Sequence, residues 1–242
     1  MFNYFDLFSQ FYLEICKDCN LHCTTCTTSK SSDLQRLTYL IKNDLFFNYY
    51  PKKKIYNIIG GDPFMHPDIA YIVTFLQANN IKVFCWTNGL FKIENIQKVI
   101  NQVNLFFIYL PTLEENEYTL LTGKNQLPQL LENISYLQEQ TKKIIINFPI
   151  TPQNIAFIPD IYNFAYYKNI HCLFHSNPKT LFTKNAKELI TRFYNIKNVF
   201  VFKSQTLTKY SCQNIANITS SYQIIKNSYY ELVNSIRKRF HL

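Results

Sequence analysis

Glycine is scarce in this chain, because it provides only 4 of the 242 residues, whereas about 7% is usual. A backbone with so little glycine has few places where it can turn sharply or let another group approach closely. Two of the four glycines, Gly60 and Gly61, are adjacent and end the apolar run KIYNIIGGDP. The sequence therefore predicts a strand that ends at this turn, where another group approaches the backbone closely.

Long apolar runs are also absent. Apolar runs such as IIINFPI are far shorter than the ~20 apolar residues that cross a membrane. The first residues, MFNYFDLFSQ, lack the basic start of a secretory signal. We therefore expect a cytoplasmic protein with no membrane partner, and a reducing compartment would also keep its cysteines as thiols.

Three cysteines, Cys19, Cys23 and Cys26, stand together in the short segment CNLHCTTC. A closed 4Fe-4S electron carrier uses four cysteines. Three cysteines leave one iron without a protein ligand, much as a catalytic zinc site keeps an open position. The spacing therefore indicates an iron-sulfur cluster whose open iron can bind a substrate or cofactor.

Other interpretations of these cysteines stay open. Buried cysteine can pack as a small hydrophobe, although this loop is polar. With Cys16 the loop holds two CxxC pairs, but only three residues separate them, whereas zinc sites usually separate their pairs by a dozen or more. Cys16 could instead complete a four-cysteine cluster in an electron carrier. The segment FYLEIC alternates as a strand does, which predicts that Cys16 is a strand residue.

Polar residues follow two predicted strands. Asp62 comes directly after Gly60 and Gly61, and Asn88 and Gly89 close the segment WTNG after IKVFCW. Each segment alone is also typical of an ordinary turn. Together with the thiols, they place a carboxylate, an amide and three sulfurs at strand ends, and the carboxyl ends of parallel strands form the functional face of α/β barrels.

Strands and helices are predicted to alternate along the chain, which calls for a parallel sheet. We predict an α/β fold, an open partial (β/α)6 barrel resembling a TIM barrel, with a short C-terminal helical segment. The chain is of a size that α/β barrels reach as one domain, so we expect a single domain over residues 1–242. The predicted strands are 11–16, 54–59, 81–86, 105–110, 143–149 and 170–174, and the predicted helices are 33–48, 67–79, 92–102, 125–140 and 153–168.

The chain resembles the radical S-adenosylmethionine (radical SAM) enzymes. The resemblance rests on CxxxCxxC after the first strand, on GGDPFMHPDI in place of the family's GGEP segment, and on TNG after the next strand. It continues through FFIYLP and IIINFPITPQNI and covers about residues 11–175. Residues 176–242 form a C-terminal part to which the resemblance gives no role, and after residue 180 only Cys212 is available, so no auxiliary cluster is expected.

The resemblance implies a set of site residues. Cys19, Cys23 and Cys26 would ligate a 4Fe-4S cluster, and its open iron would chelate S-adenosylmethionine. The side chain of Asp62 would accept from the cofactor's ammonium, since charge-assisted hydrogen bonds suit that task. The complete set of implied cofactor-binding residues is Gly60, Gly61, Asp62, Asn88, Asn147 and Thr25, the last through its backbone because the family commonly has an aromatic residue there.

The implied activity is reductive cleavage of S-adenosylmethionine to a 5′-deoxyadenosyl radical that abstracts hydrogen from a substrate. That substrate could be a peptide, a sugar, a nucleotide or a partner enzyme, and the electron donor a flavodoxin or ferredoxin. The alternative is an iron-sulfur protein that transfers electrons or activates a partner without its own SAM chemistry. The net charge of +9 is expected to reflect solvated basic faces such as Lys52–Lys54, and not a nucleic-acid site.

Overall fold

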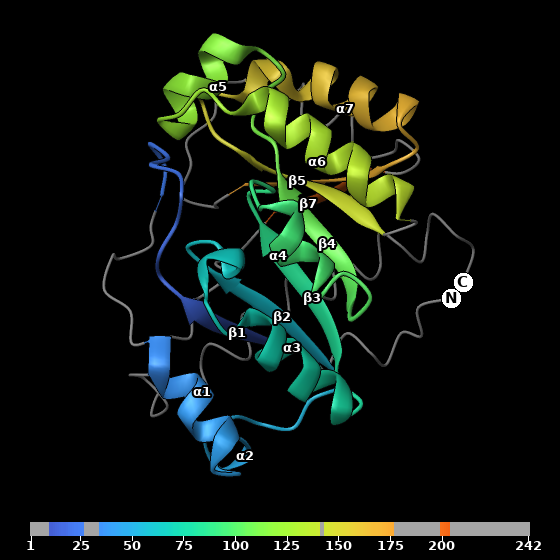
Figure 1. Ribbon diagram of the computed structural model, residues 1–242. Coiled ribbons are helices and arrows are strands. Elements are labelled where there is room, and N and C mark those ends of the chain that lie inside the picture. Colours follow the sequence, from blue (N-terminus) through green and yellow to red (C-terminus); the bar gives the residue numbers. More distant parts are fainter. Residues whose placement is uncertain (1–9, 27–33, 141–142, 177–198, 204–242) are drawn as a thin grey trace, which may run out of the picture. The chain divides into compact units, whose positions relative to one another are not determined.

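The computed structural model describes residues 10–26, 34–140, 143–176 and 199–203, and strands alternate with helices along them (Figure 1). The strands are β1 (Gln10–Cys16), β2 (Ile55–Gly60), β3 (Lys82–Thr87), β4 (Val103–Tyr109), β5 (Ile144–Ile150), β6 (His171–Ser176) and β7 (Val199–Lys203). The α-helices are α1 (Leu34–Lys42), α2 (Phe46–Tyr49), α3 (Ile69–Ala78), α4 (Ile93–Gln97), α5 (Glu115–Thr122), α6 (Leu127–Glu139) and α7 (Ile158–Tyr167), and two short 3-10 helices are η2 (Pro63–Met65) and η3 (Ile155–Phe157).

Hydrogen bonds order the seven described strands β1-β2-β3-β4-β5-β6-β7, so that strand order follows the sequence. The neighbours β1 and β2, β2 and β3, β3 and β4, β5 and β6, and β6 and β7 pair in parallel. From β1 to β6, consecutive strand-helix-strand crossovers produce this order. The predicted fold class, α/β with an open parallel sheet of the partial-barrel kind, is confirmed, whereas the predicted C-terminal helical segment lies outside the described residues.

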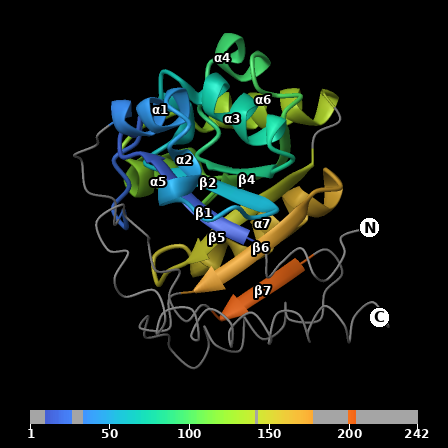
Figure 2. The same cartoon turned by 90° about the horizontal axis from the view of Figure 1, so that it is seen from below.

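The chain divides into two compact units. Unit 1 comprises the residues up to Ile108 together with Glu115–Ile144, and unit 2 comprises Tyr109–Glu114 and the residues from Ile145 onward. In unit 1, helices α1, α3 and α4 lie on one side of strands β1 to β4 (Figure 2). In unit 2, β5, β6 and β7 lie side by side. A single domain over residues 1–242 stays a prediction.

The core of unit 1 is built from the strands and from the helices beside them. Ile58 of β2 and Cys85 of β3 are paired across the sheet and are fully buried, as are Ile72 and Leu76 of α3. Buried parallel strands read as nearly continuous apolar runs, which is why segments such as IKVFCW were recognisable. Polar residues of the predicted site lie at the carboxyl ends of β1, β2 and β3.

Three helices are followed by a left-handed aspartate or asparagine in place of glycine. Asp44, Asn80 and Asn169 follow α1, α3 and α7, and their φ angles of 57°, 59° and 53° are left-handed. The N–H of the next residue donates back to the final turn each time, as in Ile81 to the Leu76 carbonyl at 3.0 Å. Asparagine and aspartate tolerate this conformation better than other residues with a side chain. They take the place that glycine usually has.

The structure differs from the predicted elements in several places, and the predicted helix 92–102 is the short helix α4, Ile93–Gln97. The predicted helix 33–48 is two helices, α1 and α2, because the left-handed Asp44 ends α1 and the N–H of Leu45 closes it on the Leu40 carbonyl. Helix α5 and strand β7 were not predicted. Among the described helices, none combines the length and apolar content that a membrane span requires.

Candidate functional site

The first strand delivers the cysteine loop next to the end of β2. A register shift between Glu14 and Cys16 lets Cys16 pair with Gly60. Beyond the strands, the N–H of Gly61 donates to the Cys16 carbonyl at 2.9 Å, and the N–H of Asp62 donates to the Asp18 carbonyl at 2.7 Å. The backbone of GGDP therefore holds the start of the loop that carries the three thiols.

Cys16 lies in β1, as predicted, and its side chain is only 2% exposed. Its Sγ donates to the backbone carbonyl of Asp62 at 3.0 Å. Burial and the nearby carboxylates of Asp62 and Asp18 raise the pKa of this thiol to about 12. A thiol that is buried, protonated and already hydrogen-bonded has the properties of a structural residue.

The other end of the loop is held by helix α5. The N–H of His22 donates to the Thr122 carbonyl at 2.9 Å, and the N–H of Thr24 donates to the Leu121 carbonyl at 3.0 Å. Both acceptors lie at the carboxyl end of α5, where helical carbonyls lack partners inside the helix. This helix, which the sequence analysis missed, thus fixes the segment between the first and last predicted ligands.

The three loop thiols influence one another electrostatically. Burial, followed by the neighbouring Cys19 and Cys26, raises the pKa of Cys23 to about 12. Burial also raises the pKa of Cys19, while hydrogen bonds from the N–H of Leu21 at 3.4 Å and from the amide of Asn88 at 3.5 Å lower it. Cys26 is exposed.

The donor set of this loop is compatible with the predicted iron-sulfur cluster. In the part of the chain that the structure describes, no three His, Cys, Asp or Glu side chains are grouped as ligands of one ion. Each cysteine of a 4Fe-4S cluster ligates a different iron, so its ligands lie further apart than those of one ion. Three neighbouring thiols, with N–H donors on one sulfur, are a donor set of that kind.

The paired glycines are required by the chain itself. A Cβ on Gly60 would overlap the carbonyl of Cys16, and a Cβ on Gly61 would overlap the carbonyls of Asp18 and Lys17. The adjacent glycines predict a close approach to this turn, and in the structure the backbone of residues 16–18 lies there. Contact of the same glycines with a cofactor stays a prediction.

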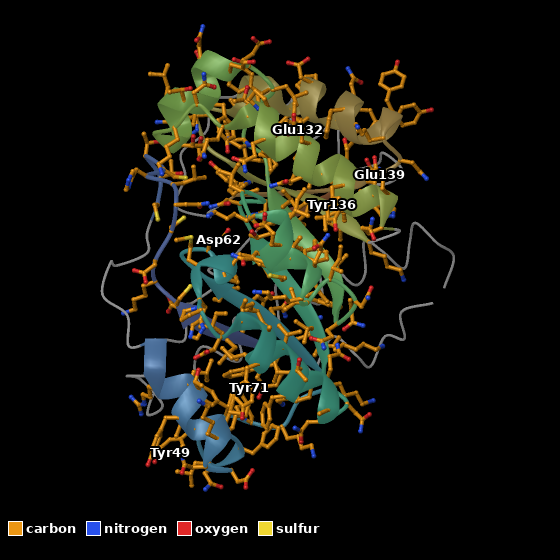
Figure 3. The ribbon with its side chains drawn as sticks, in the orientation of Figure 1. Tyr49, Asp62, Tyr71, Glu132, Tyr136 and Glu139 are labelled. Atoms are coloured by element: carbon orange, nitrogen blue, oxygen red, sulfur yellow. The ribbon has the colours of Figure 1, made fainter. Side chains whose placement is uncertain are left out.

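Asp62 lies at the end of β2 in Figure 3, and its side chain is 2% exposed. Its Oδ1 accepts from the N–H of Phe64 at 2.9 Å, and its Oδ2 accepts from the hydroxyl of Thr87 at 2.7 Å and from the N–H of Asn88 at 2.8 Å. Burial raises the pKa of this carboxyl, and the three donors oppose the shift. The carboxylate therefore joins the GGDP turn to the TNG turn.

The TNG turn meets the cysteine loop through Asn88. Its amide nitrogen donates to Asn20 Oδ1 at 2.6 Å and to the Sγ of Cys19 at 3.5 Å, and its Oδ1 accepts from the N–H of Leu90 at 2.9 Å. The amide of Asn20 donates to the Leu90 carbonyl at 2.9 Å. Asn133 of α6 supports the turn from another side through the carbonyls of Gly89 and Phe91, at 2.7 and 3.0 Å.

The structure thus brings together Cys19, Gly60, Gly61, Asp62 and Asn88. The side chain of Thr25 is exposed in the same loop. Asn147 belongs to unit 2, where its Oδ1 is 2.8 Å from Nε2 of His175 on the adjacent strand. Burial lowers the pKa of His175 to about 4, so the ring is neutral at pH 7.

Sequence reasoning missed Asn20, Thr87 and Asn133 as parts of this arrangement. Thr87 and Asn20 each stand beside a predicted site residue, so polar neighbours of the motifs were the available signal. Asn133 lies within α6 and is 4% exposed. Buried asparagine in a helix is uncommon, but its partners in the TNG turn are distant in sequence and could not be foreseen.

Surface features elsewhere on unit 1 do not adjoin this site. Tyr49 and Tyr71, which are 49% and 42% exposed, lie on α2 and α3 well away from Asp62 (Figure 3). Of the basic run 52–54, Lys52 lies over the Phe47 ring at 5.4 Å. The basic residues 237–239 and Cys212 lie outside the described residues.

The sequence matches no protein-family model, and a comparison with curated proteins finds no relative. Solved structures do show similarity. SuiB from Streptococcus suis, bound to S-adenosylmethionine, superposes with a TM-score of 0.62 and 18% identity over 81% of this chain and 48% of SuiB. The chain therefore spans about half the length of that protein.

Two further structures agree. The anSMEcpe structure with bound AdoMet and a Kp18Cys peptide has a TM-score of 0.58 and 15% identity, covering 76% of this chain and 60% of its own. TYW1 with a lysine-pyruvate adduct has a TM-score of 0.51 and 13% identity over 76% of this chain and 71% of its own. The chain therefore has the fold of the radical SAM enzymes, as its sequence motifs predict.

Proposed function

We propose that this protein is a radical SAM enzyme. It binds one 4Fe-4S cluster through Cys19, Cys23 and Cys26, and it binds S-adenosylmethionine beside that cluster. When bound, the cluster supplies the electron that cleaves the cofactor to a 5′-deoxyadenosyl radical, which abstracts hydrogen from a substrate. The cofactors carry this chemistry, while the protein supplies binding and orientation.

One observation carries the proposal. Hydrogen bonds join the cysteine loop, the GGDP turn and the TNG turn: the N–H of Asp62 donates to the Asp18 carbonyl, its carboxylate accepts from Thr87 and Asn88, and the amide of Asn88 donates to Cys19. These are the three segments on which the sequence resemblance rests, and they come from the ends of three adjacent strands. Turns at the ends of adjacent parallel strands lie side by side in any such sheet, so the support comes from the residue types that meet there, namely cysteine thiols, a carboxylate and an amide.

The other predicted site residues are assigned to parts of S-adenosylmethionine. Gly60, Gly61, Asp62 and Asn88 are assigned to the methionyl end, the two glycines through their backbone. Asn147 is assigned to the ribose, and the backbone of Thr25 to the adenine side. No side chain is assigned to the substrate.

A peptide is the proposed substrate class. SuiB is also known in a complex with the precursor peptide SuiA, and anSMEcpe with a Kp18Cys peptide. A flavodoxin or ferredoxin is the proposed electron donor, and the cytoplasm is the proposed compartment because the thiols must stay reduced to hold a cluster. A nucleic acid is not proposed, because electrostatic attraction to a basic face gives only nonspecific binding.

The four-cysteine electron carrier receives no support from Cys16, whose thiol donates to the Asp62 carbonyl inside the fold. Anaerobic reconstitution with iron and sulfide, followed by calorimetry with S-adenosylmethionine, tests the proposal. We expect one cluster per chain and saturable cofactor binding to the cluster-loaded protein, with none to the apoprotein. A loaded protein that does not bind the cofactor would favour the alternative, an iron-sulfur protein that transfers electrons or activates a partner.

A further inference from the structure

The side chain of Asn88 has a protein partner at each of its polar atoms. It is 7% exposed. Its Oδ1 accepts from Leu90, and its nitrogen donates to Asn20 Oδ1 and to the Sγ of Cys19. A primary amide nitrogen has two hydrogens, so both donations can be made at once. The contact of 2.6 Å with Asn20 fixes the amide in the orientation that directs its other hydrogen at the sulfur.

Asp62 positions both partners of the hydrogen bond between Asn88 and Cys19. Its Oδ2 accepts from the backbone N–H of Asn88 at 2.8 Å, and its own N–H donates to the carbonyl of Asp18 at 2.7 Å. Asp18 directly precedes Cys19. One buried residue therefore sets the position of the donor and the position of the sulfur.

Hydrogen bonds to ligand sulfurs are among the features that set the reduction potential of an iron-sulfur cluster. Reduction adds negative charge, part of which resides on the sulfurs. An N–H aimed at a sulfur stabilises the reduced state more than the oxidised one, and this raises the potential. Cys19 accepts two such hydrogen bonds, from Asn88 and from the N–H of Leu21.

We propose that Asn88, positioned by Asp62, donates a hydrogen bond to the Cys19 sulfur and thereby raises the reduction potential of the cluster. The inference rests on the proposed function. It assigns the amide of Asn88 to the sulfur, whereas the resemblance assigns it to S-adenosylmethionine. Asn88 is accordingly a tuning residue, and Asp62 is the residue that positions it.

The test is a redox titration of reconstituted protein, monitored by electron paramagnetic resonance without S-adenosylmethionine. Asn88→Leu removes the donor, and Asn88→Asp keeps the shape but replaces the donor by an acceptor. Both variants should retain the iron content of the wild type. At a fixed potential, the ratio of reduced to oxidised cluster should fall by about tenfold, which is about 59 mV for a one-electron couple.

Asn133→Leu is the matched control. Asn133 also donates two hydrogen bonds to the TNG turn, through Gly89 and Phe91, but it makes no hydrogen bond to Cys19. The cluster potential of Asn133→Leu should shift by much less than that of Asn88→Leu, because the amide donor at residue 88 is retained. Asn20→Ala, which removes the acceptor that orients Asn88, should shift the potential in the same direction as Asn88→Leu but by less. Should Asn88→Leu fail to hold a cluster, Asn88→Asp and Asn20→Ala carry the comparison.

Each contrary result has a distinct meaning. An unchanged potential in loaded Asn88→Leu, or an equal shift in Asn133→Leu, would overturn the inference and leave the proposed function standing. Weaker binding of S-adenosylmethionine with an unchanged potential would also overturn it and would return Asn88 to the cofactor. If the wild type forms no cluster under anaerobic reconstitution, the proposed function fails, and the inference fails with it.

Discussion

The thiol of Cys16, at the end of β1, donates a hydrogen bond of 3.0 Å to the backbone carbonyl of Asp62, just beyond the end of β2. The same two segments are joined by the N–H of Gly61 on the Cys16 carbonyl. The fourth cysteine, next to the three-cysteine motif, therefore stabilises the contact between the end of β1 and the GGDP turn. Its geometry explains why four cysteines in eleven residues need not mean four ligands.

Replacement of single cysteines separates ligands from the structural thiol. Cys19→Ala, Cys23→Ala and Cys26→Ala should each abolish cluster binding, because each removes the only protein ligand of one iron. Cys16→Ala should keep iron and sulfide near wild type and lower the free energy of unfolding by roughly 1 kcal/mol or more, through one lost hydrogen bond and a small cavity. Iron and sulfide assays with urea unfolding measure both quantities. Loss of the cluster in Cys16→Ala, to the same extent as in the other three, would instead favour the electron carrier.

Substitutions of Asp62 show whether its carboxylate has a structural role or binds the cofactor. Asp62→Ala leaves the N–H of Phe64, the hydroxyl of Thr87 and the N–H of Asn88 without their acceptor. Because a buried donor without a partner costs about 1 to 3 kcal/mol, the apoprotein should lose at least about 2 kcal/mol of unfolding free energy. Asp62→Asn should lose less, since it keeps one acceptor oxygen.

Urea unfolding of the apoproteins and calorimetry of the loaded proteins give the two readouts for Asp62. If Asp62→Ala unfolds like the wild type but no longer binds S-adenosylmethionine, the carboxylate faces the cofactor and its role as a junction is wrong.

Gly61→Ala should prevent cluster assembly although it adds a single methyl group. That methyl would overlap the carbonyls of Lys17 and Asp18, and backbone atoms cannot move aside as a flexible side chain can. Ile59→Val, in the preceding strand β2, is the control and should load normally. Normal iron content in Gly61→Ala would show that the loop has room at this point and would remove the steric account of the paired glycines.

His175 predicts a dependence of stability on pH in unit 2. Its pKa is about 4 in the folded chain and about 6.5 when unfolded. Between these values the unfolded chain binds more protons, so the free energy of unfolding falls as pH falls from about 6.5 to 4, by about 1 to 3 kcal/mol for a partly buried ring.

His175→Gln should flatten this part of the stability profile, because it removes the ring that titrates. Urea unfolding at several pH values tests the assignment. An identical slope in wild type and His175→Gln would show that another group titrates.

The sequence allowed most strands to be predicted because buried parallel strands are apolar throughout and end at turn residues. Cys16 at the end of its strand and Gly60 at the turn were recognisable for that reason. The break between α1 and α2 was not, because a left-handed Asp44 leaves only the weak signal of an Asn-Asp pair. Strand β7 lies beyond the range that the motifs cover.

The site was predictable as a set of residues but not as a network. The motifs located Asp62 and Asn88 at strand ends, since spacing and turn chemistry are local properties. Which donors occupy the Asp62 carboxylate depends on contacts across 25 and 26 residues of sequence, and these follow from the order of the strands. Asn133 entered the site through α6 for the same reason.

The measurement that tests the central claim most directly is the release of 5′-deoxyadenosine. Cluster-loaded protein, dithionite and S-adenosylmethionine are incubated anaerobically, and the products are separated and quantified by mass spectrometry. The account predicts slow formation of 5′-deoxyadenosine by the wild type without substrate, and none by loaded protein without dithionite or by Cys23→Ala. A wild-type protein that carries its full cluster, binds S-adenosylmethionine and leaves it intact under these conditions would contradict the account.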